Sequence, residues 1–135
     1  MSHGLEYKAY QATNAVCDGG YLEHFKGTEA ESSSLWLSSA PCDSDQEKSE
    51  IEALKTWYSE CPDYYGQGFT QSTGHFTQMV WKSCKTYGIW AQTCDRPGTS
   101  IHKQCVVALK MDCSANLQGS FSSQVQPGNC ANVET

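Results

Sequence analysis

Cysteine and histidine carry most of the chemistry that this sequence could perform. The chain has eight cysteines and four histidines among 135 residues. The cysteines are spread along it, and no two have the C-x-x-C spacing of structural zinc or thioredoxin-like redox sites. An even number in a small acidic chain predicts disulfides formed in an oxidising compartment, and about a hundred alternative pairings remain open.

Several other function classes are disfavoured by the sequence. There is no Gly-x-Ser-x-Gly nucleophile elbow, and paired cysteines would supply no thiolate. The formal net charge of −6 argues against nucleic-acid binding through phosphate neutralisation. No apolar run approaches the roughly 20 residues that span a bilayer, so no transmembrane segment is expected. Histidine and carboxylate side chains remain as candidates for chemistry.

The cysteine content predicts a secreted, extracellular protein. Residues 1–8 have neither the basic region nor the apolar region of a secretory signal. Either the signal has been removed and Met1 begins a fragment, or the chain is cytosolic with free thiols. We favour the first alternative, since the even cysteine count fits disulfides.

The length allows one domain, and its first part is predicted to be helical. The apolar residues of 5–16 recur at i, i+4, i+7 and i+11 and share one helix face. Residues 27–44 are expected to form a long loop with a buried anchor at 35–37. A second helix is expected from Ser44, which matches a capping box with Glu47.

The second half is predicted to be mainly β. An aromatic, glycine-rich connector over 64–69 leads to a short helical segment at 76–81. Strands are expected at 87–93 and 104–111, followed by a loop-like tail that Cys130 pins. Helices ahead of paired antiparallel strands indicate an α+β layered domain.

Residues 74–81, Gly-His-Phe-Thr-Gln-Met-Val-Trp, resemble the signature of the CAP superfamily. This superfamily comprises cysteine-rich secretory proteins, antigen 5 and pathogenesis-related proteins. Residues 5–17 and 53–60 resemble two of its helices, and 116–119 resemble part of its second signature. The segment 35–39 and the many cysteines are most similar to the secreted venom-allergen-like proteins of parasitic worms.

The resemblance implies one CAP (SCP-like) domain over residues 5–130, with 131–135 as a tail. The family fold is a three-layer α-β-α sandwich with a central antiparallel sheet, here stapled by disulfides. Family members usually have an opening helix before the position of Leu5, and the sequence lacks it. Either the sequence begins at a fragment boundary, or the helix is truly omitted and apolar surface is left exposed or covered by a partner.

The resemblance also implies a cleft with two histidines and two glutamates, where the histidines bind a divalent metal in several members. His75 matches the signature histidine, His24 the first histidine, and Glu60 the glutamate of the second helix. Ser33 stands at the usual position of the other glutamate, so the tetrad is incomplete. Two neutral imidazoles suit zinc, and Glu60 would orient a bound water or one histidine. The alternative is a structural role for both histidines and a surface role for Glu60.

Other prominent side chains are expected to be structural or solvated. Trp57, Tyr58 and Trp81 are predicted to lie in the core, as large aromatics at helical spacing usually do. Thr77 and Gln78 are expected to satisfy buried polar groups. His3 and His102 match no motif position and are expected to be solvated.

The loss of one cleft carboxylate disfavours hydrolysis by two carboxylates that act as general acid and general base, unless Glu29 or Glu31 replaces the missing group. We therefore expect a non-enzymatic binding or effector protein that modulates immunity, and for which zinc is optional. The alternatives are a metal-dependent hydrolase or protease using His24, His75 and Glu60, and a paralogue without site activity.

The expected partners follow from the same resemblance. They are a host protein or receptor, and a sterol or fatty acid. Tyr64, Tyr65 and Phe69 of the aromatic connector are the candidate lipid-binding residues, although ordinary loop packing is an alternative explanation for them.

Overall fold

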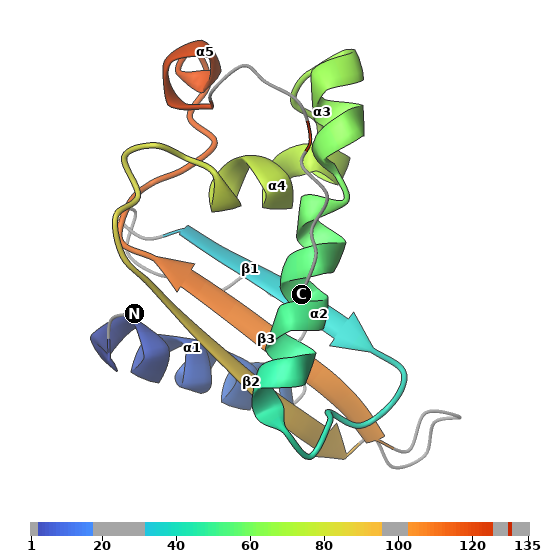
Figure 1. Ribbon diagram of the computed structural model, residues 1–135. Coiled ribbons are helices and arrows are strands. Elements are labelled where there is room, and N and C mark those ends of the chain that lie inside the picture. The colour runs from blue at the N-terminus through green and yellow to red at the C-terminus, as the bar shows by residue number, and fades with distance from the viewer. Residues whose placement is uncertain (1–2, 18–31, 96–102, 126–129, 131–135) are drawn as a thin grey trace.

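Three antiparallel strands form the centre of the molecule (Figure 1). The computed structural model describes residues 3–17, 32–95, 103–125 and 130. In chain order the elements are α1 (His3–Ala15), β1 (Ser32–Ser38), α2 (Gln46–Tyr58), α3 (Cys61–Gln67), the 3₁₀ turn η2 (Gln71–Thr73), α4 (Gly74–Met79), β2 (Tyr87–Asp95), β3 (Lys103–Met111) and α5 (Phe121–Gln124).

The sheet has the order β1-β3-β2, which places the most apolar strand in the middle. Trp36 of β1 lies opposite Val107 of β3, and Ile89 of β2 lies opposite Leu109. Nearly all of β3 is buried, as expected for a strand covered on both faces. The predicted α+β class with a central antiparallel sheet is confirmed.

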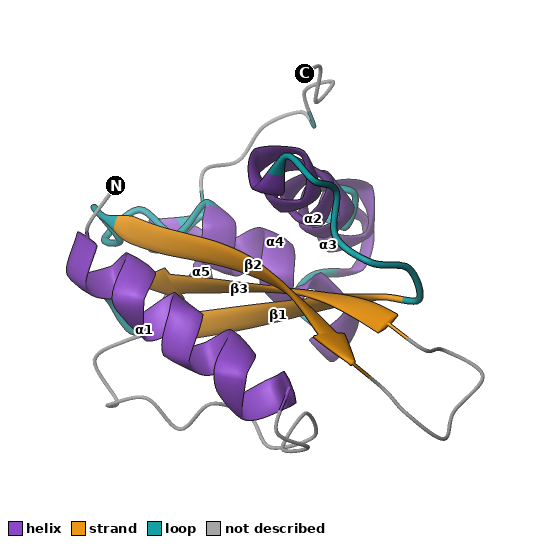
Figure 2. Ribbon diagram, turned by 90° about the horizontal axis from the view of Figure 1, so that it is seen from below, coloured by secondary structure: helices purple, strands orange, loops and turns teal. Residues whose placement is uncertain are grey.

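Helices cover both faces of this sheet, with α1 on one side and α2 on the other (Figure 2). Successive side chains of a strand point to opposite faces. Val107 accordingly packs with Ala53 and Trp57 of α2, whereas Ala108 packs with Ala9 and Ala12 of α1. The apolar face predicted for the first helix is the face that is buried.

Helix α1 lies unusually close to β2. A Cβ atom at Gly88 would overlap the backbone of Leu5 and Glu6, so only glycine permits this approach. Further along the helix, the Thr13 hydroxyl donates to Gln92 Oε1 at 2.7 Å. Helix and strand are therefore fixed to one another at more than one point.

Two segments differ from the sequence prediction. Residues 32–38 form an edge strand, not part of a long loop, because they pair with residues 105–111 of β3. Residues 64–67 of the aromatic connector belong to helix α3, which has a proline in its first turn, where a missing N–H costs nothing. The N-cap of α2 is Asp45, which accepts the Glu47 N–H, so the predicted cap at Ser44 is wrong by one residue.

All eight cysteines form disulfides: Cys17–Cys94, Cys42–Cys105, Cys61–Cys130 and Cys84–Cys113. The prediction of a disulfide framework is confirmed, and the structure selects one pairing. The Cys61–Cys130 bond pins the C-terminal tail beside the start of α3, as expected. No helix in the described part of the chain is long and apolar enough to cross a membrane.

Candidate functional site

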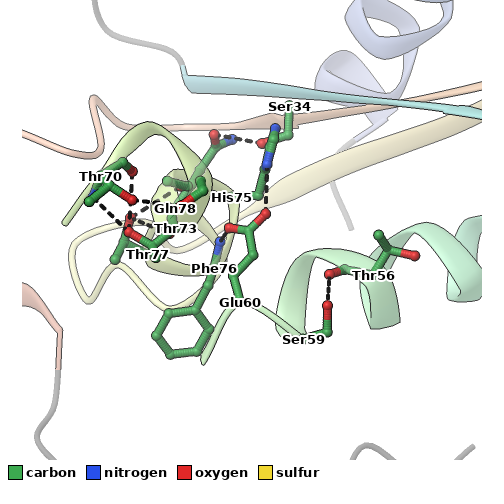
Figure 3. A network of polar contacts seen from close by, with 12 residues as sticks. Ser34, Thr56, Ser59, Glu60, Thr70, Thr73, His75, Phe76, Thr77 and Gln78 are labelled. Carbon is green, nitrogen blue, oxygen red and sulfur yellow. Dashed lines mark hydrogen bonds and ion pairs between the residues drawn. The ribbon is translucent and has the colours of Figure 1, made fainter. Parts of the chain in front are cut away.

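A carboxylate and an imidazole meet between α3 and α4. Glu60 Oε2 lies 2.9 Å from His75 Nδ1, and Glu60 Oε1 accepts the Phe76 backbone N–H at 2.9 Å (Figure 3). An ionised carboxylate can only accept hydrogen bonds, so Nδ1 of a neutral His75 carries the proton. Nε2 is thereby left with its lone pair.

Local structure explains why Glu60 can reach His75. Helix α2 ends at Tyr58, and Glu60 follows as the residue that caps the start of α3. His75 is the second residue of α4, so its backbone lies next to the free N–H of Phe76. One carboxylate therefore fixes both the imidazole and the first turn of α4.

The His75 ring is held but still accessible. It stacks on Trp57, with ring centroids 5.8 Å apart and an interplanar angle of 20°. The His75 side chain is 40% exposed, whereas that of Glu60 is 16% exposed. Trp57 itself is buried, as predicted, and its contact with His75 adds a positioning role that the sequence did not show.

A second polar pair lies beside this site. The Ser34 hydroxyl of β1 donates to Gln78 Oε1 of α4 at 2.8 Å (Figure 3). Gln78 Nε2 is buried and meets no hydrogen-bond acceptor among the described residues. A buried donor without a partner is costly, so this amide is a candidate ligand contact. Nothing in the residue type of Ser34 could have signalled this pairing.

The start of α4 is anchored to the segment that follows β3. Asn116 Nδ2 donates to the Gly74 carbonyl at 3.0 Å, and the Thr77 hydroxyl bonds to Asn116 Oδ1. Asn116 has a φ of 60°, a left-handed conformation that asparagine tolerates. The expected structural role of Thr77 is confirmed, whereas Gln78 is only half satisfied.

The structure brings together only part of the predicted cleft. His75 and Glu60 are in contact, as the resemblance implied. His24 and His102 lie outside the described residues. Ser33 pairs with Lys110 in the β1–β3 ladder, and its side chain is outside the described part. His3 is exposed at the start of α1, as expected.

The candidate lipid-binding residues belong to a cluster of aromatic rings, which we call the aromatic cluster: Tyr58, Tyr64, Tyr65, Phe69, Phe76, Trp81 and Phe121. Tyr64 packs inward against Phe76 and Phe121. Tyr65 and Phe69 are 40% and 44% exposed. Two of the three candidates therefore present ring surface to solvent.

Another group of ligand types lies elsewhere. Cys84, Asp112 and Cys113 bring their sulfur and carboxylate atoms close together. The two cysteines form a disulfide, and Asp112 accepts the Lys85 N–H at 2.8 Å. Because cysteine binds a metal through its thiolate, these two cysteines could act as ligands only after reduction of the disulfide.

The layered α+β fold and the Glu60–His75 contact define the class of domain suggested by the signature segment. Residues 1–109 match the model of the cysteine-rich secretory protein family. Since this match covers most of the chain, the protein belongs to the CAP family.

Individual relatives are similar over short segments. A 40-residue segment is 52% identical to the Golgi-associated plant pathogenesis-related protein 1 of Homo sapiens, covering 28% of this chain and 26% of that protein. A 77-residue segment is 32% identical to Protein PRY2 of Saccharomyces cerevisiae, covering 56% and 22%. A 36-residue segment is 44% identical to Salivary antigen-5 of Dipetalogaster maximus, covering 26% and 14%. The matches thus span about a quarter or less of each of these relatives.

Proposed function

We propose that this protein is a secreted, non-enzymatic CAP-domain binding or effector protein, whose cleft holds a divalent metal through His75 and His24. The observation that carries the proposal is the Glu60–His75 contact, because in a neutral ring it leaves Nε2 with its lone pair, on a side chain that is 40% exposed.

The donor set at the cleft fits zinc. A metal-binding histidine commonly donates its other ring N–H to a carboxylate, as His75 does to Glu60. One imidazole is not a site, so His24 and water would supply the other ligands that zinc needs. Zinc bound there would act as a Lewis acid or as a bridge to a partner.

Calorimetric titration with zinc tests the metal proposal. We expect saturable binding by the wild type, and losses of affinity of at least tenfold in both His75→Ala and His24→Ala. His3→Ala is the matched control, because His3 lies on α1 beyond the other face of the sheet. Wild-type affinity in both cleft variants would contradict the proposal.

The incomplete tetrad supports binding over catalysis. Ser33 stands where the family usually has a second glutamate, so one acid/base group is missing. A metal-dependent hydrolase or protease is the second candidate, favoured by the same Glu60–His75 pair. Peptide hydrolysis that zinc stimulates and His75→Ala abolishes would overturn the non-enzymatic proposal.

The exposed part of the aromatic cluster supports binding of a sterol or fatty acid. Tyr65 and Phe69 offer ring surface, and Phe69 lies 4.7 Å from Phe121, centroid to centroid. Rings of this kind contribute large apolar contact area to a ligand. We therefore assign the lipid contact to these residues, and assign Tyr64 a packing role.

Labelled cholesterol tests this assignment. Tyr65→Ser with Phe69→Ser should abolish binding while leaving the fold intact, since both side chains are largely exposed. Tyr87→Ser, at an exposed tyrosine of β2, is the control and should bind normally. An absence of wild-type binding to both cholesterol and a labelled fatty acid would eliminate the lipid proposal.

Secretion and immune modulation rest on the disulfides and on the family. Four disulfides persist in oxidising compartments, and one matching relative is a salivary antigen. Alkylation and mass analysis of the protein from its native source should show eight protected cysteines and extracellular recovery. Free thiols in a cytosolic fraction would contradict this part of the proposal.

A further inference from the structure

A hollow on the other side of the sheet, away from His75, has an unusual lining. It measures about 360 Å³ and is lined by His3, Glu6, Tyr7, Tyr10 and Trp90. Its volume lies within the range of small-molecule sites. We refer to it as the aromatic hollow.

The rings of the aromatic hollow form a corner. Tyr10 and Trp90 lie 5.4 Å apart between centroids and at 81°, so they form two walls at nearly a right angle. Tyr7 continues the Tyr10 wall, 6.1 Å from it and at 34°. Tyr7 is 60% exposed and Tyr10 is 37% exposed, which leaves ring surface free for a ligand.

The corner is fixed by the packing beneath it. Tyr7 and Tyr10 are on consecutive turns of α1, and Trp90 is on β2, two residues after Gly88. Because a Cβ at Gly88 would overlap the helix backbone, α1 lies as close to the strand as glycine allows. The backbone segments that carry the rings are therefore fixed relative to one another before any ligand binds, which lowers the entropic cost of binding.

The charged side chain that lines the hollow is acidic. Glu6 lines it, and among the described residues neither lysine nor arginine does. Glu6 therefore places negative charge at the hollow, where it would attract a cationic ligand.

We propose that the aromatic hollow binds a trimethylammonium group, as carried by choline. Several aromatic faces with a carboxylate are the chemistry that recognises quaternary ammonium ions, since the rings attract a cation that lacks hydrogen-bond donors. A neutral apolar ligand of the same shape would gain contact area but no cation–π attraction. A primary amine would be held in water by its hydration.

Choline titration followed by NMR tests the proposal through the indole N–H of Trp90, assigned with Trp90→Phe. Choline should shift this signal in a saturable way, whereas 3,3-dimethylbutan-1-ol, its uncharged isostere, should bind several-fold more weakly. Glu6→Gln and Tyr7→Ala should each weaken choline binding by roughly two- to fivefold. Tyr87→Ala, at an exposed tyrosine outside the hollow, should leave the affinity unchanged.

Phosphatidylcholine vesicles distinguish a lipid headgroup from dissolved choline as the source of the group. The lipid headgroup would be assigned as the ligand if the protein sediments with these vesicles but not with phosphatidylglycerol vesicles, and if Tyr7→Ala abolishes this sedimentation. Choline binding without vesicle binding would assign a dissolved ligand, and both results support the hollow. The proposal is overturned if choline and its isostere bind equally, if Tyr7→Ala has no effect, or if neither choline nor vesicles bind.

Discussion

The Glu60 carboxylate is hydrogen-bonded to Nδ1 of His75. This bond occupies Nδ1, so only Nε2 can bind a ligand. The contact joins residues 15 positions apart in the chain, because α3 and α4 fold back on one another. The carboxylate thereby determines which nitrogen of His75 keeps a lone pair.

Replacing Glu60 with glutamine should impair zinc binding without changing the shape of the site. A glutamine amide can donate to Nδ1, and this favours the tautomer whose Nε2 carries the proton and cannot bind metal. We expect Glu60→Gln to lower zinc affinity about 10- to 100-fold by calorimetry. Glu52→Gln, on the exposed side of α2, is the control. Unchanged zinc affinity in Glu60→Gln would show that the carboxylate does not orient the ligand.

The Ser34–Gln78 pair should be strongly coupled in stability. Ser34→Ala leaves both polar groups of the Gln78 amide buried without partners, so it should cost about 1–3 kcal/mol. Adding Gln78→Met removes the stranded amide and should recover part of this loss. A double-mutant cycle in urea measures the coupling. Additive effects would indicate that the hydrogen bond contributes nothing.

Gly88 should tolerate no side chain, whereas Gly66 should accept one. Gly88→Ala forces α1 away from β2, which should destabilise the fold by about 1–3 kcal/mol. Gly66 lies inside α3, and a Cβ there meets nothing within 4 Å. Gly66→Ala should therefore stabilise by up to about 0.5–1 kcal/mol. Denaturant midpoints compare the two, and equal midpoints would contradict the close approach of α1.

Asp112 should make stability depend on acid pH. Burial acts to raise its pKa, but hydrogen bonds from Lys85 and Thr86 outweigh this effect and hold the pKa below its usual value. The carboxylate therefore stabilises the fold above the unfolded pKa of about 3.9, and this contribution is lost as the pH falls through the lower folded pKa. Asp112→Asn should lower the melting temperature at neutral pH, and the difference should disappear in strong acid. A constant difference at all pH values would exclude this titration as the cause.

Sequence patterns predicted the elements whose residues carry their own signal. The apolar run of β3 and the periodic stripe of α1 are examples, and both are buried as expected. The strand β1 was missed because Ser32–Ser34 has no apolar pattern, and it is a strand only because β3 pairs with it. Helix α3 was missed because Tyr64, Tyr65 and Gly66 are poor local helix formers that tertiary packing holds in place.

Some residues of the candidate site could likewise be predicted from the sequence, and others could not. His75 was proposed from the signature segment and Glu60 from the resemblance of residues 53–60 to a family helix, because the family resemblance supplies long-range information that spacing cannot. The Ser34–Gln78 contact depends on the β1 register, which the sequence did not predict. The aromatic hollow was also missed, since Tyr7 and Tyr10 are useful only once Gly88 brings Trp90 beside them.

The sheet separates the two sites proposed for this protein. His75 stacks on Trp57, which packs on one face of β3, whereas the aromatic hollow is built from α1 and the opposite face. The sites share no residue. The affinity for the metal should therefore not depend on whether the quaternary ammonium ion is bound, and the reverse should also hold. One molecule could hold both ligands at once and so bring them together without allosteric coupling.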